Sequence, residues 1–177
     1  MDDIEAAKLP EFFKVWAVIH GRCSDPKEGP DTIGRLKSKG CKVWSYRCNQ
    51  FMQGLSMLGY YRFYPWEAYM LGLEGFAYWT AYSPQGDDGW DSRDGYDEGF
   101  CWRGLDKKPV PTKILEAVRE GLEDVAYMDL LKRSGNAEAK SLLDARESVI
   151  KAKDQKVLDS WRLSAGRLID ELSRKNK

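Results

Sequence analysis

Polar and aromatic side chains recur where the apolar segments of this chain end. His20 closes one apolar run, Tyr46 and Asn49 lie at the end of a second, and Trp79 and Tyr82 lie at the end of a third. Aromatic rings can cover the C–H face of a pyranose ring, and amide, imidazole or guanidinium groups can bind its hydroxyls. Arg62 and Trp66, between the second and third runs, could add to such a site. The candidate substrate-binding residues are therefore His20, Tyr46, Asn49, Arg62, Trp66, Trp79 and Tyr82.

Several of these side chains also fit a purely structural role. Trp79 suits a core position as well as a ligand floor, with the small Gly75 and Ala77 on the same strand face. An arginine such as Arg62 often holds a loop through its carbonyl groups. Trp44 lies two residues before Tyr46, and for Trp44 we favour core packing.

The carboxylate pairs do not predict catalytic residues. Glu123 and Asp124 are adjacent on a predicted helix, so their side chains diverge by about 100° and cannot converge on one bond. Arg119, four residues before Glu123, indicates structural ion pairing. Asp87, Asp88 and Asp91 lie in a glycine-rich loop, where turn-forming aspartates are ordinary. His20 has no Ser or Cys nucleophile motif beside it, which favours a substrate-contacting or structural role.

Composition excludes several classes of partner. The 177 residues carry 28 basic and 28 acidic side chains with no long run of either sign, which argues against nucleic acid and anionic membrane surfaces. No apolar stretch approaches the roughly 18 residues of a membrane span, and residues 1–10 do not resemble an export signal. The cysteines Cys23, Cys41, Cys48 and Cys101 have no C-x-x-C spacing and the chain has a single histidine, so no structural zinc site is expected. Four cysteines allow two disulfides, but we favour small buried side chains in a reduced chain. No cofactor is expected.

The hydrophobic pattern predicts alternating strands and helices. Strands are expected over residues 12–19, 41–48 and 75–81, the first buried on both faces. Helices are expected over residues 31–39 and 66–73, and residues 82–110 read as a long loop that could hold a lid around Trp90 and Tyr96. Three helices follow, over residues 111–134, 137–152 and 155–174, the first with an apolar stripe formed by Leu115, Val118, Leu122, Ala126 and Leu130.

This order predicts an α/β fold with about three parallel strands followed by C-terminal helices. A parallel sheet of three strands has two unpaired edges, which proteins normally close or cover. We therefore expect either association into a homo-oligomer or a further polypeptide that completes the sheet. We divide the chain into a domain over residues 1–135 and a helical extension over residues 136–177.

Four segments in order resemble the last third of the glycoside hydrolase family 123-like catalytic barrel, of the type also called domain of unknown function 4091. They are the sequence LKSKGCKVWSYRC, the R-x-x-P-W of Arg62 to Trp66, GFAYW from Gly75, and PVPTKILEAVREGLEDVAYMDLL from Pro109. The chain departs from the family pattern at Ile114 and at Phe100-Cys101.

The resemblance implies that the strands are the last units of a partial TIM-type (β/α) barrel. Family members resemble β-N-acetylgalactosaminidases with a catalytic Asp-Glu pair on an earlier strand, and that pair is not expected in this chain. The implied function is substrate binding within a hydrolase of β-linked N-acetylhexosaminides, incomplete for catalysis alone. The partner is then an N-acetylhexosamine-containing glycan, and full-length relatives are expected to be exported. The alternative is a non-catalytic carbohydrate- or protein-binding or assembly module.

Overall fold

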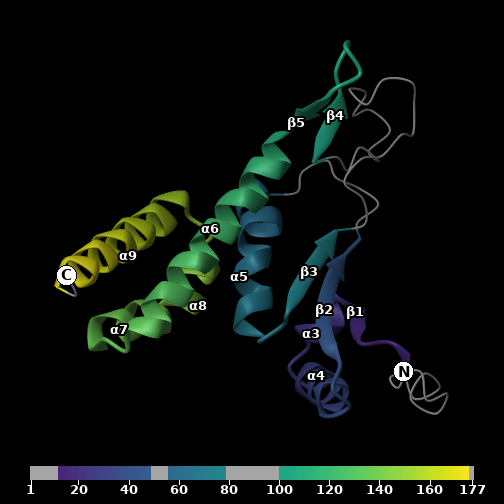
Figure 1. Ribbon diagram of the computed structural model, residues 1–177, viewed down its shortest axis with the longest axis horizontal. Coiled ribbons are helices and arrows are strands. Elements are labelled where there is room, and N and C mark those ends of the chain that lie inside the picture. The colour runs from purple at the N-terminus through teal and green to yellow at the C-terminus, as the bar shows by residue number, and fades with distance from the viewer. Residues whose placement is uncertain (1–11, 49–55, 79–99, 176–177) are drawn as a thin grey trace. The chain divides into compact units, whose positions relative to one another are not determined.

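The fold is mixed α/β, with a three-stranded parallel sheet and a set of C-terminal helices (Figure 1). The computed structural model describes residues 12–48, 56–78 and 100–175, without the side chains of residues 102 and 103. The predicted alternation of strands and helices is therefore confirmed at the level of fold class.

The three strands lie in chain order as neighbours. Strand β1 (Val15–Ile19) pairs in parallel with β2 (Lys42–Arg47), which pairs in parallel with β3 (Gly75–Tyr78). The connection from β1 to β2 contains the short helix α3 (His20–Cys23) and the helix α4 (Gly29–Ser38). Parallel neighbours require such crossovers, because the chain must return to the same end of the sheet.

One face of this sheet is covered and packs a small core. Helices α3 and α4 lie against β1 and β2 (Figure 1), and the core beneath them consists of Cys23, Ile33, Leu36, Cys41 and Val43. The other face, called the open face, carries exposed apolar side chains among the described residues, namely Val15, Ile19 and Trp44. The prediction that the first strand is buried on both faces is wrong, because Val15 and Ile19 are each 49% exposed.

A π-helical turn, η1 (Met57–Arg62), leads directly into α5 (Phe63–Met70). The hydroxyl of Ser56 accepts a hydrogen bond from the Gly59 amide at 2.9 Å and caps the start of this turn. Helix α5 begins three residues earlier than the pattern predicted, because Pro65 is tolerated in the first turn of a helix. The chain then turns at Gly72, whose φ of +68° favours glycine.

The predicted loop over residues 82–110 ends in a β-hairpin. Residues 79–99 lie outside the described part of the chain, and β4 (Cys101–Arg103) pairs antiparallel with β5 (Pro109–Pro111). The turn between them is closed by the amide of Gly104, which donates to the carbonyl of Lys108 at 2.8 Å. The prediction of unbroken loop is therefore wrong for residues 101–110.

Helix α6 (Lys113–Ser134) ends where predicted, before Gly135, whose φ is +60°. It begins two residues later than predicted, because Pro111 belongs to β5. Its buried stripe differs from the prediction, because Leu122 and Leu130 are exposed. The observed stripe is centred on Gly121, where an added Cβ would lie 2.2 Å from the carbonyl oxygen of Arg62. The residues buried along the helix are Ala117, Val118, Gly121, Asp124, Met128 and Leu131.

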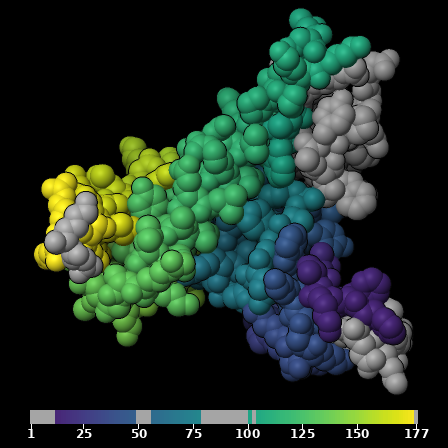
Figure 2. All heavy atoms as spheres, viewed as in Figure 1, coloured from purple at the N-terminus to yellow at the C-terminus, as the bar shows by residue number. Residues whose placement is uncertain are grey.

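The remaining chain forms three helices where the pattern predicted two: α7 (Ala137–Asp144), α8 (Arg146–Ala152) and α9 (Gln155–Lys175). Figure 2 shows α9, in yellow, against α6 and α7, in green. The indole of Trp161 donates to the Leu142 carbonyl at 2.9 Å and fixes α9 to α7.

The contacts divide the chain into two compact units. The first consists of Met1–Gly54 and Glu67–Thr112, and the second of Leu55–Trp66 and Lys113–Lys177. This division groups α6 with the helices that follow it, whereas the sequence-based boundary after residue 135 separated them.

The four cysteines are free thiols in this structure: Cys23 and Cys41 are buried, Cys101 is half-buried and Cys48 is exposed. Among the described residues, no helix has the length and apolar character needed to cross a membrane.

Candidate functional site

The open face of the sheet carries an ordered set of apolar side chains. Because paired residues of parallel strands share a face, two rows cross the sheet on this side. Trp44 forms the first row with its register partners in β1 and β3, and Tyr46 forms the second. The rows are Ala17–Trp44–Gly75 and Ile19–Tyr46–Ala77. The second row lies nearer the carboxyl ends of the strands.

Trp44 lies across the backbone of β3. A Cβ added at Gly75 would meet the Trp44 ring at 2.5 Å, so only glycine allows the indole to occupy this position. The side chain is 37% exposed. The prediction that Trp44 packs in the core is therefore wrong: it belongs to the open face, with Tyr46 beside it.

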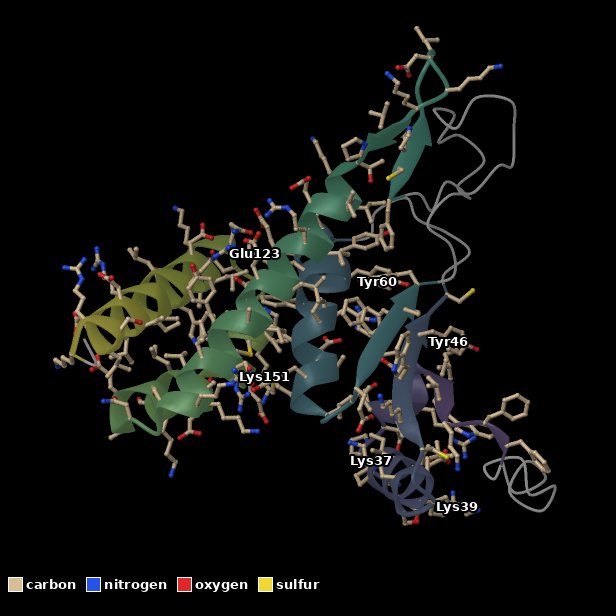
Figure 3. All side chains as sticks on the ribbon, viewed as in Figure 1. Lys37, Lys39, Tyr46, Tyr60, Glu123 and Lys151 are labelled. Carbon is tan, nitrogen blue, oxygen red and sulfur yellow. The ribbon has the colours of Figure 1, made fainter. Side chains whose placement is uncertain are left out.

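Tyr46 occupies the position that its place in the sequence predicted. It is half-buried near the carboxyl end of β2, whereas Lys37 and Lys39 lie toward the opposite end of that strand (Figure 3). Ligands of parallel α/β sheets bind beyond the carboxyl ends of the strands. The open face thus presents the rings of Trp44 and Tyr46, and Tyr46 lies near the carboxyl ends of the strands.

A polar cluster lies on the helix-covered face at the same end of the sheet. The Nε2 atom of His20 lies 3.0 Å from a carboxylate oxygen of Glu67, and its Nδ1 atom lies 3.3 Å from the hydroxyl of Ser45. Arg47 donates to the same Glu67 oxygen, Oε2. These bonds join the ends of β1 and β2 to α5 within the first unit.

The order hydroxyl, imidazole, carboxylate is also that of a nucleophilic triad. Ser45 has no accessible surface in this structure and His20 is buried. The Ser45 hydroxyl therefore cannot reach an electrophile that arrives from solvent. A triad nucleophile must reach the substrate carbon. His20 is thus an interior residue that joins two strand ends, and it does not present its ring to a ligand as the sequence-based prediction required.

Arg62 and Trp66 are buried in the second unit, in contrast to the predicted exposed binding role. Arg62 Nε donates to Asp124 at 3.0 Å, and Trp66 Nε1 donates to the same carboxylate oxygen at 3.2 Å. Arg62 also pairs with Glu120 at 2.8 Å. The indole of Trp66 packs on that of Trp161, with ring centroids 4.6 Å apart. Both predicted residues therefore hold helices together and offer no surface to a ligand.

Three of the predicted binding residues cannot be placed. Asn49, Trp79 and Tyr82 lie outside the described residues, and so do the aspartates at 87, 88 and 91 and the aromatic residues Trp90 and Tyr96. Their roles stay predictions.

The predicted ion pairing of Glu123 with Arg119 is confirmed. Glu123 is half-buried and pairs with Arg162 as well, whereas Asp124 is fully buried. Both carboxylates also contact Arg162, and Asp124 has no accessible surface, so their contacts are those of structural ion pairs. In the described part of the chain, no group of three or more His, Cys, Asp or Glu side chains is placed to hold a metal ion.

Sequence reasoning missed the other members of the polar cluster. Ser45 and Arg47 alternate with Trp44 and Tyr46 along β2, so strand periodicity alone places them on the opposite face. No local pattern indicated that Glu67 meets Arg47, because this contact joins residues 20 positions apart.

Comparison of the chain with protein-family models and with curated proteins found no match to either.

Proposed function

We propose that this chain binds carbohydrate on the open face of its sheet, as the substrate-binding C-terminal part of a glycoside-hydrolase-like barrel. The observation that carries the proposal is Trp44, which lies over Gly75 with its ring partly exposed and with Tyr46 in the next row. Burying an aromatic face against the C–H face of a sugar is favourable, and such rings are common in sugar sites.

A barrel fragment is consistent with the arrangement of the sheet. In a (β/α) barrel the helices cover the outer face of a parallel sheet, and the inner face is lined by side chains from alternate strand positions. Here α3 and α4 cover one face of the sheet, and the open face carries Trp44 and Tyr46. The resemblance of the sequence to the family 123-like barrel supports the same assignment.

The resemblance also supplies the substrate class, a β-linked N-acetylhexosaminide. We assign to this chain the binding of that substrate and not its hydrolysis, because Asp124 is fully buried against Arg62 and Glu123 is paired with Arg119 and Arg162. Catalysis would require a carboxylate pair from a further part of the barrel.

Isothermal titration of the intact chain with N-acetylgalactosamine tests the proposal. Trp44→Ala should abolish the binding heat, because it removes the platform. Leu105→Ala is the matched control, since Leu105 is a fully exposed apolar side chain in the hairpin. The absence of heat with N-acetylgalactosamine, N-acetylglucosamine and short glycans containing them would refute carbohydrate binding.

A chromogenic β-N-acetylgalactosaminide tests the assignment of catalysis. We expect no hydrolysis by the 177-residue chain. Turnover that depends on a carboxylate of this chain would contradict that assignment while leaving carbohydrate binding intact.

A second candidate function, a protein-binding or assembly module, is favoured by the exposure of Val15 and Ile19 on β1. Exposed apolar residues on an edge strand are typical of surfaces that pair with another chain. Sedimentation or light scattering gives the mass in solution: a concentration-dependent oligomer that Ile19→Asp dissociates would favour assembly, and a monomer would argue against self-association.

A further inference from the structure

Strand β1 forms an edge of the sheet and turns backbone groups outward. Among the described residues, β1 pairs with β2 alone. The Lys42 amide donates to the Lys14 carbonyl at 2.7 Å, so Lys14 turns its backbone groups toward β2. Successive residues of a strand turn these groups to alternate sides. Val15, Ala17 and Ile19 therefore turn theirs away from β2, to the edge of the sheet.

The residues of β1 do not protect this edge. Proteins commonly blunt an edge strand with charged side chains or prolines. Strand β1 reads Val-Trp-Ala-Val-Ile and has neither, and its Val15 and Ile19 side chains are each 49% exposed. The hairpin offers a contrast, because the short strand β5 carries Pro109 and Pro111 at its two ends. The edge of β1 is therefore suited to the addition of another strand.

The outward groups of β1 are self-complementary about Ala17. In an antiparallel pair with its two-fold axis beside Ala17, this residue faces Ala17 of the second copy, and Ile19 faces Val15 of the second copy. The two Ala17 residues then exchange N–H···O=C bonds, as facing residues of such a pair do. Ile19 precedes α3 as its N-cap, where the carbonyl serves the helix, and its amide stays at the edge to donate to the Val15 carbonyl. The side chains of Val15 and Ile19 become cross-strand neighbours, a favourable β-branched pair.

We infer that two copies of this chain associate through β1 in this register and form one continuous sheet. The formal net charge is zero, with 28 basic and 28 acidic side chains, so net charge does not hold two copies apart. A closed two-fold contact is also the commonest form of homo-oligomer. Since facing residues of a strand pair share a face, the open faces of both copies lie on one side of the joined sheet.

This inference goes beyond the proposed function and does not depend on it, because it uses the backbone edge of β1 and not the Trp44 ring. It concerns the 177-residue chain. In a complete barrel, a preceding strand would occupy the same edge.

Amide hydrogen exchange of the wild-type chain tests the register residue by residue. The Trp16 and Val18 amides turn toward β2 and should exchange slowly at every protein concentration. The Ala17 and Ile19 amides should exchange fast in micromolar protein and about tenfold or more slowly at millimolar protein, where sedimentation should give the mass of a dimer. A monomeric mass throughout, or exchange at Ala17 and Ile19 that does not change with concentration, overturns the inference.

Substitution at Ala17 gives the second test. Ala17→Pro removes the central donor, and proline is tolerated on an edge strand where the N–H faces outward. It should weaken dimerisation about tenfold or more, because two symmetric hydrogen bonds are lost. Ala17→Ser keeps the amide and is the matched control, which should dimerise like the wild type.

Circular dichroism verifies that the Ala17 variants fold. If Ala17→Pro does not fold, Val15→Lys takes its place, because it puts a charge on the edge. A dimer that persists undiminished in the folded variant locates the interface elsewhere and overturns the inference. The proposed function is tested separately by the binding heat with sugar, so the two can fail independently.

Discussion

Replacing Asp124 with alanine should destabilise the second unit severely. Asp124 is fully buried and accepts hydrogen bonds from Arg62 Nε at 3.0 Å and from Trp66 Nε1 at 3.2 Å. The other carboxylate oxygen of Asp124, Oδ1, lies 3.5 Å from Arg162 Nε. Removing the carboxylate leaves a buried guanidinium with Glu120 as its remaining acidic partner, and it leaves the indole N–H without its acceptor.

The size of the effect follows from this burial. Removing one partner of a buried ion pair typically costs about 3–5 kcal/mol. For a chain of this size, a loss of about 1 kcal/mol in unfolding free energy lowers the melting temperature by about 2–4 °C. The melting temperature of Asp124→Ala should therefore lie about 6 °C or more below that of the wild type.

The assay is thermal unfolding followed by circular dichroism at 222 nm, which reports on the helices. Glu116→Ala is the matched control on the same helix, because Glu116 forms an exposed pair with Arg119. The control should melt close to the wild type, as exposed pairs contribute little. If Asp124→Ala and Glu116→Ala melt together, the buried cluster does not hold these helices, and the reasoning is refuted.

Two further predictions concern packing and pH. Gly121→Ala should lower the free energy of unfolding by about 1–3 kcal/mol, because the added Cβ would lie 2.2 Å from the Arg62 carbonyl oxygen. At Gly34 an added Cβ would meet no atom within 4 Å, so Gly34→Ala should raise the free energy of unfolding by about 0.5–1 kcal/mol. Chemical denaturation measures both, and equal effects would contradict the packing at Gly121. The hydrogen bond from Arg162 lowers the pKa of Glu123 despite the opposing effect of burial, and Arg119 adds to the lowering. A lowered carboxyl pKa contributes stability above the usual value of about 4.3, and this contribution is lost as the pH falls through the folded-state pKa. The loss of stability on acidification should therefore be smaller in Glu123→Gln than in the wild type, and equal losses would argue against the pairing.

The sequence predicted the parallel strands and the long C-terminal helices, because hydrophobic periodicity and glycine positions are local signals. It misplaced the buried face of α6, since Leu122 and Leu130 look like core residues and Asp124 does not. The acidic residue is buried because Arg62 and Trp66, about 60 positions earlier, supply its donors. Such a pairing leaves no trace in local periodicity.

The same reason explains the changes in the candidate site. Tyr46 could be predicted because strand alternation sets its face. Arg62 and Trp66 were misassigned because an arginine beside a tryptophan suits a ligand as well as a buried carboxylate, and only the fold distinguishes the two. Trp44 was misassigned because the open face of the sheet is a property of three strands together.

Saturation-transfer-difference NMR with N-acetylgalactosamine tests the central claim, carbohydrate binding on the Trp44–Tyr46 face, most directly. Irradiation of aromatic protein protons should transfer saturation to the ring C–H protons of the sugar in the wild type, and Trp44→Ala should remove that transfer. Undiminished transfer in the Trp44→Ala variant, or none in the wild type at millimolar sugar, would contradict it.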